Sequence, residues 1–145
     1  MMTNQTATKF GYPNNLIVET SHWSILLRPT QVTLGSLILV CSEETKSIGK
    51  MSSAASTDFH RACNILESTL TNAFAPDKFN YLALMMVDPH VHFHVIPRYK
   101  SEVEFNDRMF NDMLWPKPPI LAETIKLNDL EMKKLLATLK MKLSK

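Results

Sequence analysis

Residues 88–98 have the sequence Asp88-Pro89-His90-Val91-His92-Phe93-His94-Val95-Ile96-Pro97-Arg98, the most informative stretch of the 145-residue chain. Three of the five histidines stand here at every second position, and β-branched or aromatic residues separate them. This alternation predicts a β-strand, on which side chains two positions apart share a face. We therefore expect the three histidines to line one side of a sheet, facing an open pocket. The residues between them should enter a core.

The run from His90 to Ile96 resembles the His-φ-His-φ-His-φ-φ signature of the histidine triad (HIT) family, where φ is hydrophobic, and Pro97-Arg98 continues it as in many members. The resemblance covers about residues 16–99. It implies a nucleotide hydrolase or nucleotidyl transferase that acts at the α-phosphate of a nucleoside polyphosphate or phosphoramidate. It also implies a homodimer, no cofactor and no metal in the chemistry.

The same resemblance assigns a role to each histidine. His92 is the nucleophile, His94 is a hydrogen-bond partner on the phosphate side, and His90 supports and orients the array. Imidazole suits this work because its ordinary pKa, about 6.5, leaves much of it neutral and nucleophilic near pH 7. Attack on phosphorus would give a covalent nucleotidyl-histidine intermediate that water then hydrolyses, which replaces one difficult displacement by two easier ones.

Hydrophobic patterns of period two and period 3.6 predict the other elements. Expected strands cover residues 16–19, 22–27, 37–41 and 79–87, and expected helices cover residues 57–74 and a segment that begins at Asn128. Ser56, Thr57 or Asp58 would cap the first helix, and Asn128 with Glu131 resembles a capping box for the second. Asp88-Pro89 is short enough to predict a hairpin between the strand that ends at 87 and the histidine strand.

The order of these elements predicts an α+β domain. The resemblance gives it the HIT-like fold, an antiparallel sheet of about five strands with one long helix packed on it, plus a C-terminal amphipathic helix. Residues 1–145 form a single domain in which residues 100–145 extend the part that resembles the family. Residues 1–14 are expected to be loose or wrapped over the surface, and residues 100–127 to be ordered but irregular. Trp115 in that segment would belong to a lid, a dimer contact or a strut.

The chain departs from the family pattern where phosphate is usually held. Residues 84–89 contain no glycine and no hydroxyl or amide side chain. Ser36 stands where a histidine is common, and this alignment makes it a candidate substrate contact. Arg28 stands where many members carry an Asn or Asp that contacts ribose. Arg28 is a candidate substitute for the phosphate grip because its planar fork suits phosphate. Arg98 is a second candidate, although it would serve equally to hold a carboxylate, and Asp88 is either a proton-transfer group or a turn residue.

Two other classes of function compete with the enzyme. His-x-His on a strand can supply two zinc ligands, with Asp88, His22 or His60 as further donors. His90 and His94 would lie roughly 13 Å apart on a regular strand, which disfavours one ion shared by all three histidines. The other alternative is a module that binds nucleotide without turnover, because the usual phosphate loop is missing.

Composition limits the remaining possibilities. A net charge of +2 is too small to indicate nucleic acid or a membrane surface as partner. No apolar run approaches the roughly 20 residues of a membrane span. The two cysteines, Cys41 and Cys63, lie in apolar stretches without a C-x-x-C spacing and are expected to be buried free thiols. The first residues do not resemble a signal peptide. A reducing cytoplasm fits these features, and the resemblance to the HIT family implies a small nucleotide as the partner.

Overall fold

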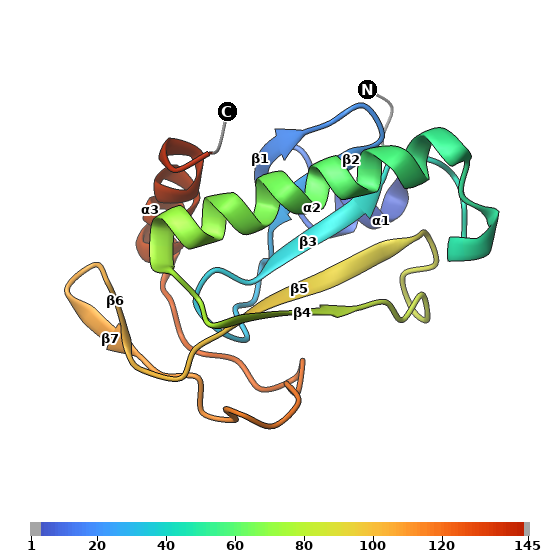
Figure 1. Cartoon of the computed structure of the whole chain (residues 1–145). Helices are drawn as coiled ribbons and strands as arrows, with labels where there is room; N and C mark the ends of the chain where they lie inside the picture. The colour runs from blue at the N-terminus through green and yellow to red at the C-terminus, as the bar shows by residue number, and fades with distance from the viewer. Residues whose placement is uncertain (1–3, 144–145) are drawn as a thin grey trace.

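A five-stranded antiparallel sheet forms the centre of the computed structural model, which describes residues 4–143. Its strands follow the order β1-β2-β3-β5-β4 across the sheet. Their bounds are Leu16–Glu19 (β1), Trp23–Leu27 (β2), Leu37–Cys41 (β3), Lys78–Leu82 (β4) and His92–Arg98 (β5). The histidine-bearing strand β5 therefore lies between β3 and the edge strand β4 (Figure 1). The predicted α+β class and the five-stranded sheet are confirmed.

One long helix, α2 (Ser53–Phe74), crosses one face of the sheet (Figure 1). Its buried residues Ala62, Leu66 and Leu70 recur at helical spacing and pack on alternate residues of the strands. Trp23 anchors this core, because its ring is fully buried and its Nε1 donates to the backbone oxygen of Ala55 over 2.8 Å. The helix therefore covers one face of the sheet, and the histidines lie on the opposite face.

The opposite face carries a smaller apolar cluster formed by Ala7, Leu26, Ile38 and Val40. Ile38 and Val40 are the cross-strand partners of His94 and His92, so this cluster shares its face with the two histidines. The short helix α1 (Gln5–Lys9) supplies Ala7 and covers this face. The N-terminal segment therefore wraps over the sheet, one of the two alternatives expected for residues 1–14; residues 1–3 lie outside the described part.

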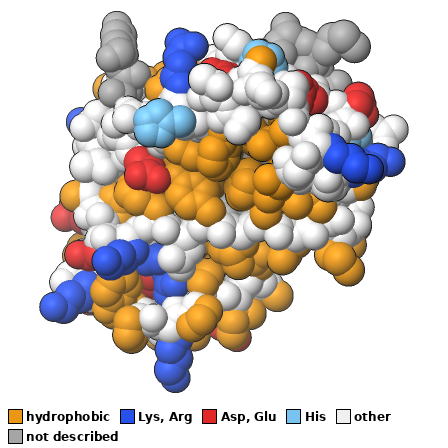
Figure 2. All heavy atoms as spheres, turned by 45° about the vertical axis from the view of Figure 1, so that its right-hand side comes forward, with side chains coloured by type: hydrophobic (Ala, Val, Ile, Leu, Met, Phe, Trp, Pro, Cys, Tyr) orange, Lys and Arg blue, Asp and Glu red, His pale blue; other side chains and the backbone are white. Residues whose placement is uncertain are grey.

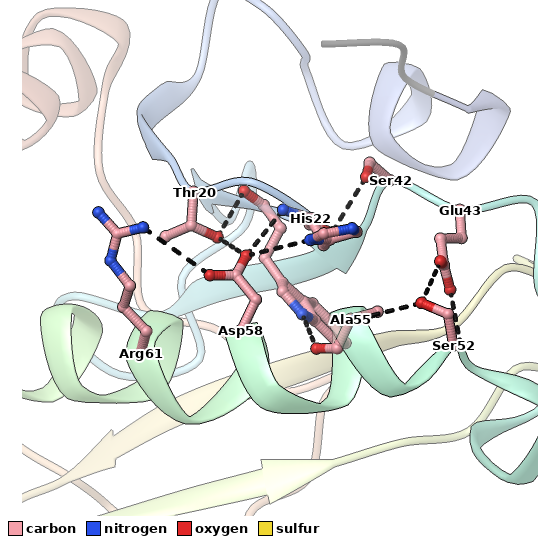
Figure 3. A network of polar contacts seen from close by, with 9 residues as sticks. Thr20, His22, Ser42, Glu43, Ser52, Ala55, Asp58 and Arg61 are labelled. Atoms are coloured by element: carbon pink, nitrogen blue, oxygen red, sulfur yellow. Dashed lines mark hydrogen bonds and ion pairs between the residues drawn. The ribbon is translucent and has the colours of Figure 1, made fainter.

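A polar network fixes the start of α2 to the strands (Figure 3). Asp58, which is buried, accepts hydrogen bonds from the Thr20 hydroxyl over 2.6 Å and from the His22 backbone over 2.7 Å. Glu43 accepts from the backbone and hydroxyl of Ser52, whose hydroxyl in turn caps α2 at Ala55. The chain that leaves β3 is thus held at a defined position near the histidines.

In the C-terminal part, the predicted helix start is confirmed, whereas a short hairpin was not predicted. The helix α3 (Asp129–Met141) begins at the expected capping box, in which Asn128 and Glu131 each bond the other's backbone. Residues 100–127, expected to be irregular, contain the hairpin of β6 (Val103–Phe105) and β7 (Arg108–Phe110). Asn106 and Asp107 form its two-residue turn with φ values of +54° and +60°, which Asn and Asp tolerate better than most residues.

Two further expectations about boundaries are wrong, and one short element was not predicted. The helix α2 starts at Ser53 with Ser52 as its cap, ahead of the predicted caps, because its first turn is polar and shows no hydrophobic period. The strand β4 ends at Leu82 rather than at 87, and residues 83–91 form a longer connection in place of a tight hairpin. Between β3 and α2 lies the 3₁₀ turn η1 (Ile48–Lys50), which no pattern predicted.

None of the helices in the described residues is both long enough and apolar enough to cross a membrane. Cys41 and Cys63 are free thiols, as expected; Cys41 is buried and Cys63 only half-buried. Burial raises the pKa of both thiols, which disfavours their reactive thiolate form.

Candidate active site

Two of the three histidines lie on strand β5 and one lies just before it. His92 and His94 occupy the first and third positions of the strand, and their ring centroids are 5.2 Å apart. His90 belongs to the bend that leads into the strand, so the predicted row of three on one strand is wrong at its first member. The backbone of Val91 pairs with both Cys41 and Thr45, which aligns this bend with the end of β3.

The hydrogen bond of His92 defines its tautomer. Its Nδ1 lies 2.7 Å from the backbone oxygen of His90. A carbonyl can only accept, so Nδ1 must carry the proton, and in the neutral ring Nε2 bears the free lone pair. The bend at His90 therefore places a carbonyl where it leaves Nε2 of His92 as the ring nitrogen with the free lone pair.

His94 is held in the opposite tautomer. The Nε atom of Arg28 lies 3.3 Å from Nδ1 of His94, and a guanidinium nitrogen can only donate. Nδ1 must therefore accept, and Nε2 carries the proton. Burial, together with the positive charge of Arg28 and the neighbouring His92, lowers the pKa of His94 to about 4, although Asp88 acts in the other direction. His94 is accordingly a neutral hydrogen-bond donor at physiological pH.

Arg28 itself is a buried cation without a counter-ion. Its side chain is shielded from solvent, and Nη1 donates to the backbone oxygen and hydroxyl of Thr30 at 2.7 and 2.6 Å. No carboxylate within residues 4–143 forms an ion pair with it. The two N–H groups of Nη2 have no protein acceptor among these residues. A buried unpaired guanidinium next to His94 is suited to an anion.

Both ring nitrogens of His90 form hydrogen bonds. Nδ1 lies 3.0 Å from the hydroxyl of Thr6, on α1, and Nε2 lies 2.7 Å from a carboxylate oxygen of Glu44. Glu44 follows Glu43, which the network at the start of α2 holds in place (Figure 3). These two contacts fix the ring of His90 and, through its backbone oxygen, the orientation of His92.

The expected open pocket is not present. Only 2% of His92 and 7% of His94 is exposed. The ring of Phe10, which follows α1, lies over both, with centroid distances of 5.6 Å to His92 and 5.7 Å to His94. The prediction of a central ring free in a pocket is therefore wrong for this conformation, because the N-terminal segment was not expected to cover that face.

The other predicted site residues have structural partners. Ser36 is fully buried, and its hydroxyl bonds the backbone nitrogen and oxygen of Thr33, so a substrate contact at Ser36 is contradicted. Arg98 forms two hydrogen bonds with the carboxylate of Asp112, at 2.6 and 3.1 Å. Of the two predicted alternatives for Arg98, it therefore binds a carboxylate. Asp88 lies in the bend and pairs with Lys9 at 2.6 Å. Of the predicted substrate contacts, only Arg28 directly adjoins the histidines.

No group of three or more His, Cys, Asp or Glu side chains in residues 4–143 is arranged to hold one metal ion. The suggested extra ligand His22 lies in the network around Asp58, with its Nδ1 3.9 Å from a carboxylate oxygen of that residue. The ring nitrogens of His90 are taken by Thr6 and Glu44. The zinc alternative therefore lacks a donor set in the described part of the chain.

A cavity of about 610 Å³ lies beside the edge strand β4. Residues 78–82 form one wall, and Trp115 with the following prolines forms another. Leu82, which lines this cavity, is the cross-strand partner of His94. The cavity therefore lies next to the part of the sheet that carries the histidines. Trp115 is therefore a wall of this cavity, a role that the sequence left open.

Three residues near the histidines were not predicted: Thr6, Phe10 and Glu44. Thr6 and Phe10 belong to a short polar segment with no hydrophobic period, and Glu44 lies in a loop. Contacts between residues that are far apart in the chain produce no recognisable spacing in the sequence. The two aromatic residues Phe10 and Tyr12 in an otherwise polar segment were the available hint.

Comparison with solved structures places this arrangement among known folds. The chain is similar to a histidine triad protein from Sinorhizobium meliloti (TM-score 0.74, 19% identity, covering 98% of this chain and 96% of the other). It is also similar to a histidine triad protein from Marinobacter aquaeolei (TM-score 0.72, 20% identity, 99% and 97%) and to one from Bradyrhizobium japonicum (0.69, 17%, 89% and 90%). No protein-family model and no curated protein sequence matches the chain. The chain therefore has the fold of the histidine triad proteins.

Proposed function

We propose that this protein is a member of the histidine triad family and acts as a nucleotide hydrolase or nucleotidyl transferase. The substrate class is a nucleoside polyphosphate or nucleoside phosphoramidate, and the reaction centre is its α-phosphorus. The observation that carries the proposal is the bond from Nδ1 of His92 to the His90 carbonyl, because it reserves Nε2 of His92 for attack. The fold shared with histidine triad proteins supports it.

In the first step, Nε2 of His92 forms a bond to the α-phosphorus, and the bond from phosphorus to the leaving group breaks. The leaving group departs with the electron pair of that bond and takes up a proton. In the second step, the oxygen of water or of an acceptor alcohol bonds to phosphorus and loses its proton, and the N–P bond returns its electron pair to Nε2. The products are a nucleoside monophosphate or its ester and the original neutral imidazole.

Two neighbours supply what the missing phosphate loop would provide. Nε2–H of His94 and the two free N–H groups of Arg28 are donors of the type that stabilises charge on the non-bridging phosphoryl oxygens. His94 is suited to this because its low pKa keeps it neutral, with its proton on a defined nitrogen. In this proposal Arg28 binds the phosphate, whereas Arg98 is engaged with Asp112.

The test is incubation of the full chain with adenosine and guanosine phosphoramidates and diphosphates, followed by intact-mass measurement and peptide mapping. We expect a mass increase of one nucleotidyl group on His92, trapped most easily by rapid acid-free quenching. His92→Gly should lose the adduct and turnover, whereas His60→Gln, an exposed histidine on α2, should keep both. Full turnover by His92→Gly would refute the proposal.

A nucleotide-binding module without turnover is the second candidate, and the burial of His92 favours it. In that case nucleoside monophosphates would raise the melting temperature while no product or adduct appeared. The same incubation, followed by chromatography, separates the two candidates.

We further propose a homodimer in a reducing cytoplasm. The strand β4 is an edge of the sheet, and the half-buried aromatic rings of Phe59, Tyr81 and Phe93 lie between it and α2. Figure 2 shows hydrophobic side chains gathered in one area of the surface, as expected for a face that packs against a partner. Light scattering coupled to size exclusion should give twice the mass of 16.5 kDa.

A further inference from the structure

We propose that residues 4–15 form a cover over the catalytic face, and that a substrate reaches His92 only after Phe10 leaves its place. This inference rests on the proposed function for what enters, but not for the cover itself. The phosphorus of a substrate must come within roughly 3 to 3.5 Å of the attacking nitrogen. With Phe10 packed on both strand histidines and His92 2% exposed, no nucleotide has that approach.

Polar contacts attach the cover along its length, and at its end the backbone oxygen of Asn15 accepts from the backbone of Leu27 over 2.9 Å. Asn4 donates to the backbone oxygen of Cys41 over 2.9 Å, Thr6 bonds His90, and Lys9 pairs with Asp88. The last two contacts go to the bend that carries the first histidine. The Lys9 side chain is 54% exposed, so its ion pair adds little. Among the cover's side chains, Ala7, Phe10 and Tyr12 pack on the apolar cluster of the histidine face.

The helix of the cover contributes little stability of its own. α1 has five residues, far fewer than an isolated helix needs in water. Gly11 follows Phe10 with a φ of +97°, a conformation that other residues rarely adopt, and there the chain turns back toward β1. A cover held in this way can detach as a unit while the sheet and α2 stay folded.

The surface beneath the cover is suited to an incoming anion. Arg28 is buried without a carboxylate partner within the described residues, and Nε2 of His94 is a neutral donor. A phosphate that reaches these donors offsets the loss of the apolar contacts of Phe10. The closed state should therefore reduce apparent substrate affinity by the fraction of molecules that are open.

The first test measures access to His92 without any need for turnover. We expect diethyl pyrocarbonate to modify His92 slowly in the wild-type chain and at least about tenfold faster in Phe10→Ala, as followed by peptide mapping. Tyr12→Phe is the matched control, because it lies in the same segment and loses only the hydroxyl bond to Glu19. Rapid modification of His92 in the wild type, or an unchanged rate in Phe10→Ala, would overturn the cover.

The second test measures the consequence for substrate. With adenosine phosphoramidate, Phe10→Ala should raise kcat/KM about ten- to a hundredfold through a lower KM, with kcat nearly unchanged and the melting temperature recorded for both variants. A fall in kcat/KM would overturn the cover by making Phe10 part of the substrate site. If no variant turns over, the proposed function fails, and the modification rates alone decide whether the cover exists.

Discussion

The Nε atom of Arg28 lies 3.3 Å from Nδ1 of His94, so a guanidinium determines which nitrogen of a buried histidine carries the proton. At His92, the backbone oxygen of His90 has the opposite effect, because it accepts from Nδ1 and leaves Nε2 without a proton in the neutral ring. Neighbouring rings on one face of β5 thus present an acceptor nitrogen and a donor nitrogen. This pairing is what phosphoryl transfer needs, since one group attacks phosphorus while the other binds its oxygens.

The first prediction concerns Arg28→Met. Removal of the guanidinium takes away a positive charge that lowers the pKa of His94, so that pKa should rise above its wild-type value of about 4. It should stay below the ordinary value because burial remains the larger cause. Nitrogen-15 spectra of the imidazole should also show loss of the single Nε2–H tautomer. Arg61→Met, at an exposed position on α2, should leave the titration unchanged, and an unchanged His94 in Arg28→Met would contradict this account.

The second prediction is a pH dependence of stability. The pKa of His94 is about 4 in the folded chain and near 6.5 when unfolded, so between these values the unfolded chain binds more protons. The free energy of unfolding therefore rises with pH in this window, and His94's contribution is lost as the pH falls toward 4. Urea unfolding should show His94→Gln losing about 2 to 3 kcal/mol less than wild type between pH 7 and pH 4.5. Parallel curves for the two proteins would contradict the low pKa.

The third prediction uses two glycines. Gly35 has a φ of +89°, and a Cβ there would meet Leu70 at 3.0 Å and Phe74 at 3.4 Å. Gly35→Ala should lower the free energy of unfolding by more than about 1 kcal/mol, through both backbone strain and crowding against α2. A Cβ added at Gly49 would meet no atom within 4 Å, so Gly49→Ala should change stability by less than about 0.5 kcal/mol. Equal effects in chemical denaturation would contradict this explanation.

The parts of the fold that the sequence predicted are those with a strong hydrophobic pattern. The strands at 16–19 and 37–41 match because each is an apolar stretch of strand length, and the end of α2 matches because its apolar residues recur at helical spacing. The hairpin β6–β7 was missed because its strands have three residues each, too few for a period to show. α1 was missed for the same reason.

In the candidate site, too, the features with a local sequence pattern were predicted and those that join distant residues were not. The two histidines on β5 share a face because alternation alone requires it. The grip on His90 by Thr6 and Glu44 joins residues 84 and 46 positions apart, so no local pattern could predict it. Ser36 was assigned to the substrate from an alignment of motifs, whereas the fold uses its hydroxyl to close a turn with Thr33.

The fourth prediction concerns the ion pair of Arg98 and Asp112, whose side chains are 4% and 3% exposed. Asp112→Ala leaves a buried guanidinium without its carboxylate and should cost about 3 to 5 kcal/mol in the free energy of unfolding. The double variant Arg98→Met with Asp112→Ala removes the uncompensated charge and should therefore be more stable than Asp112→Ala alone. Glu102→Ala, at an exposed position, is the control and should stay within about 0.5 kcal/mol of wild type.

Urea titrations at pH 7 of the wild type, Arg98→Met, Asp112→Ala, the double variant and Glu102→Ala measure these differences. The ordering matters more than the absolute values, because it separates a buried charge left unpaired from a simple loss of packing. If the double variant is as unstable as the sum of its two single changes, the two residues are not coupled. Arg98 would then have to be reconsidered as a group that is available to substrate, contrary to its two short bonds to Asp112.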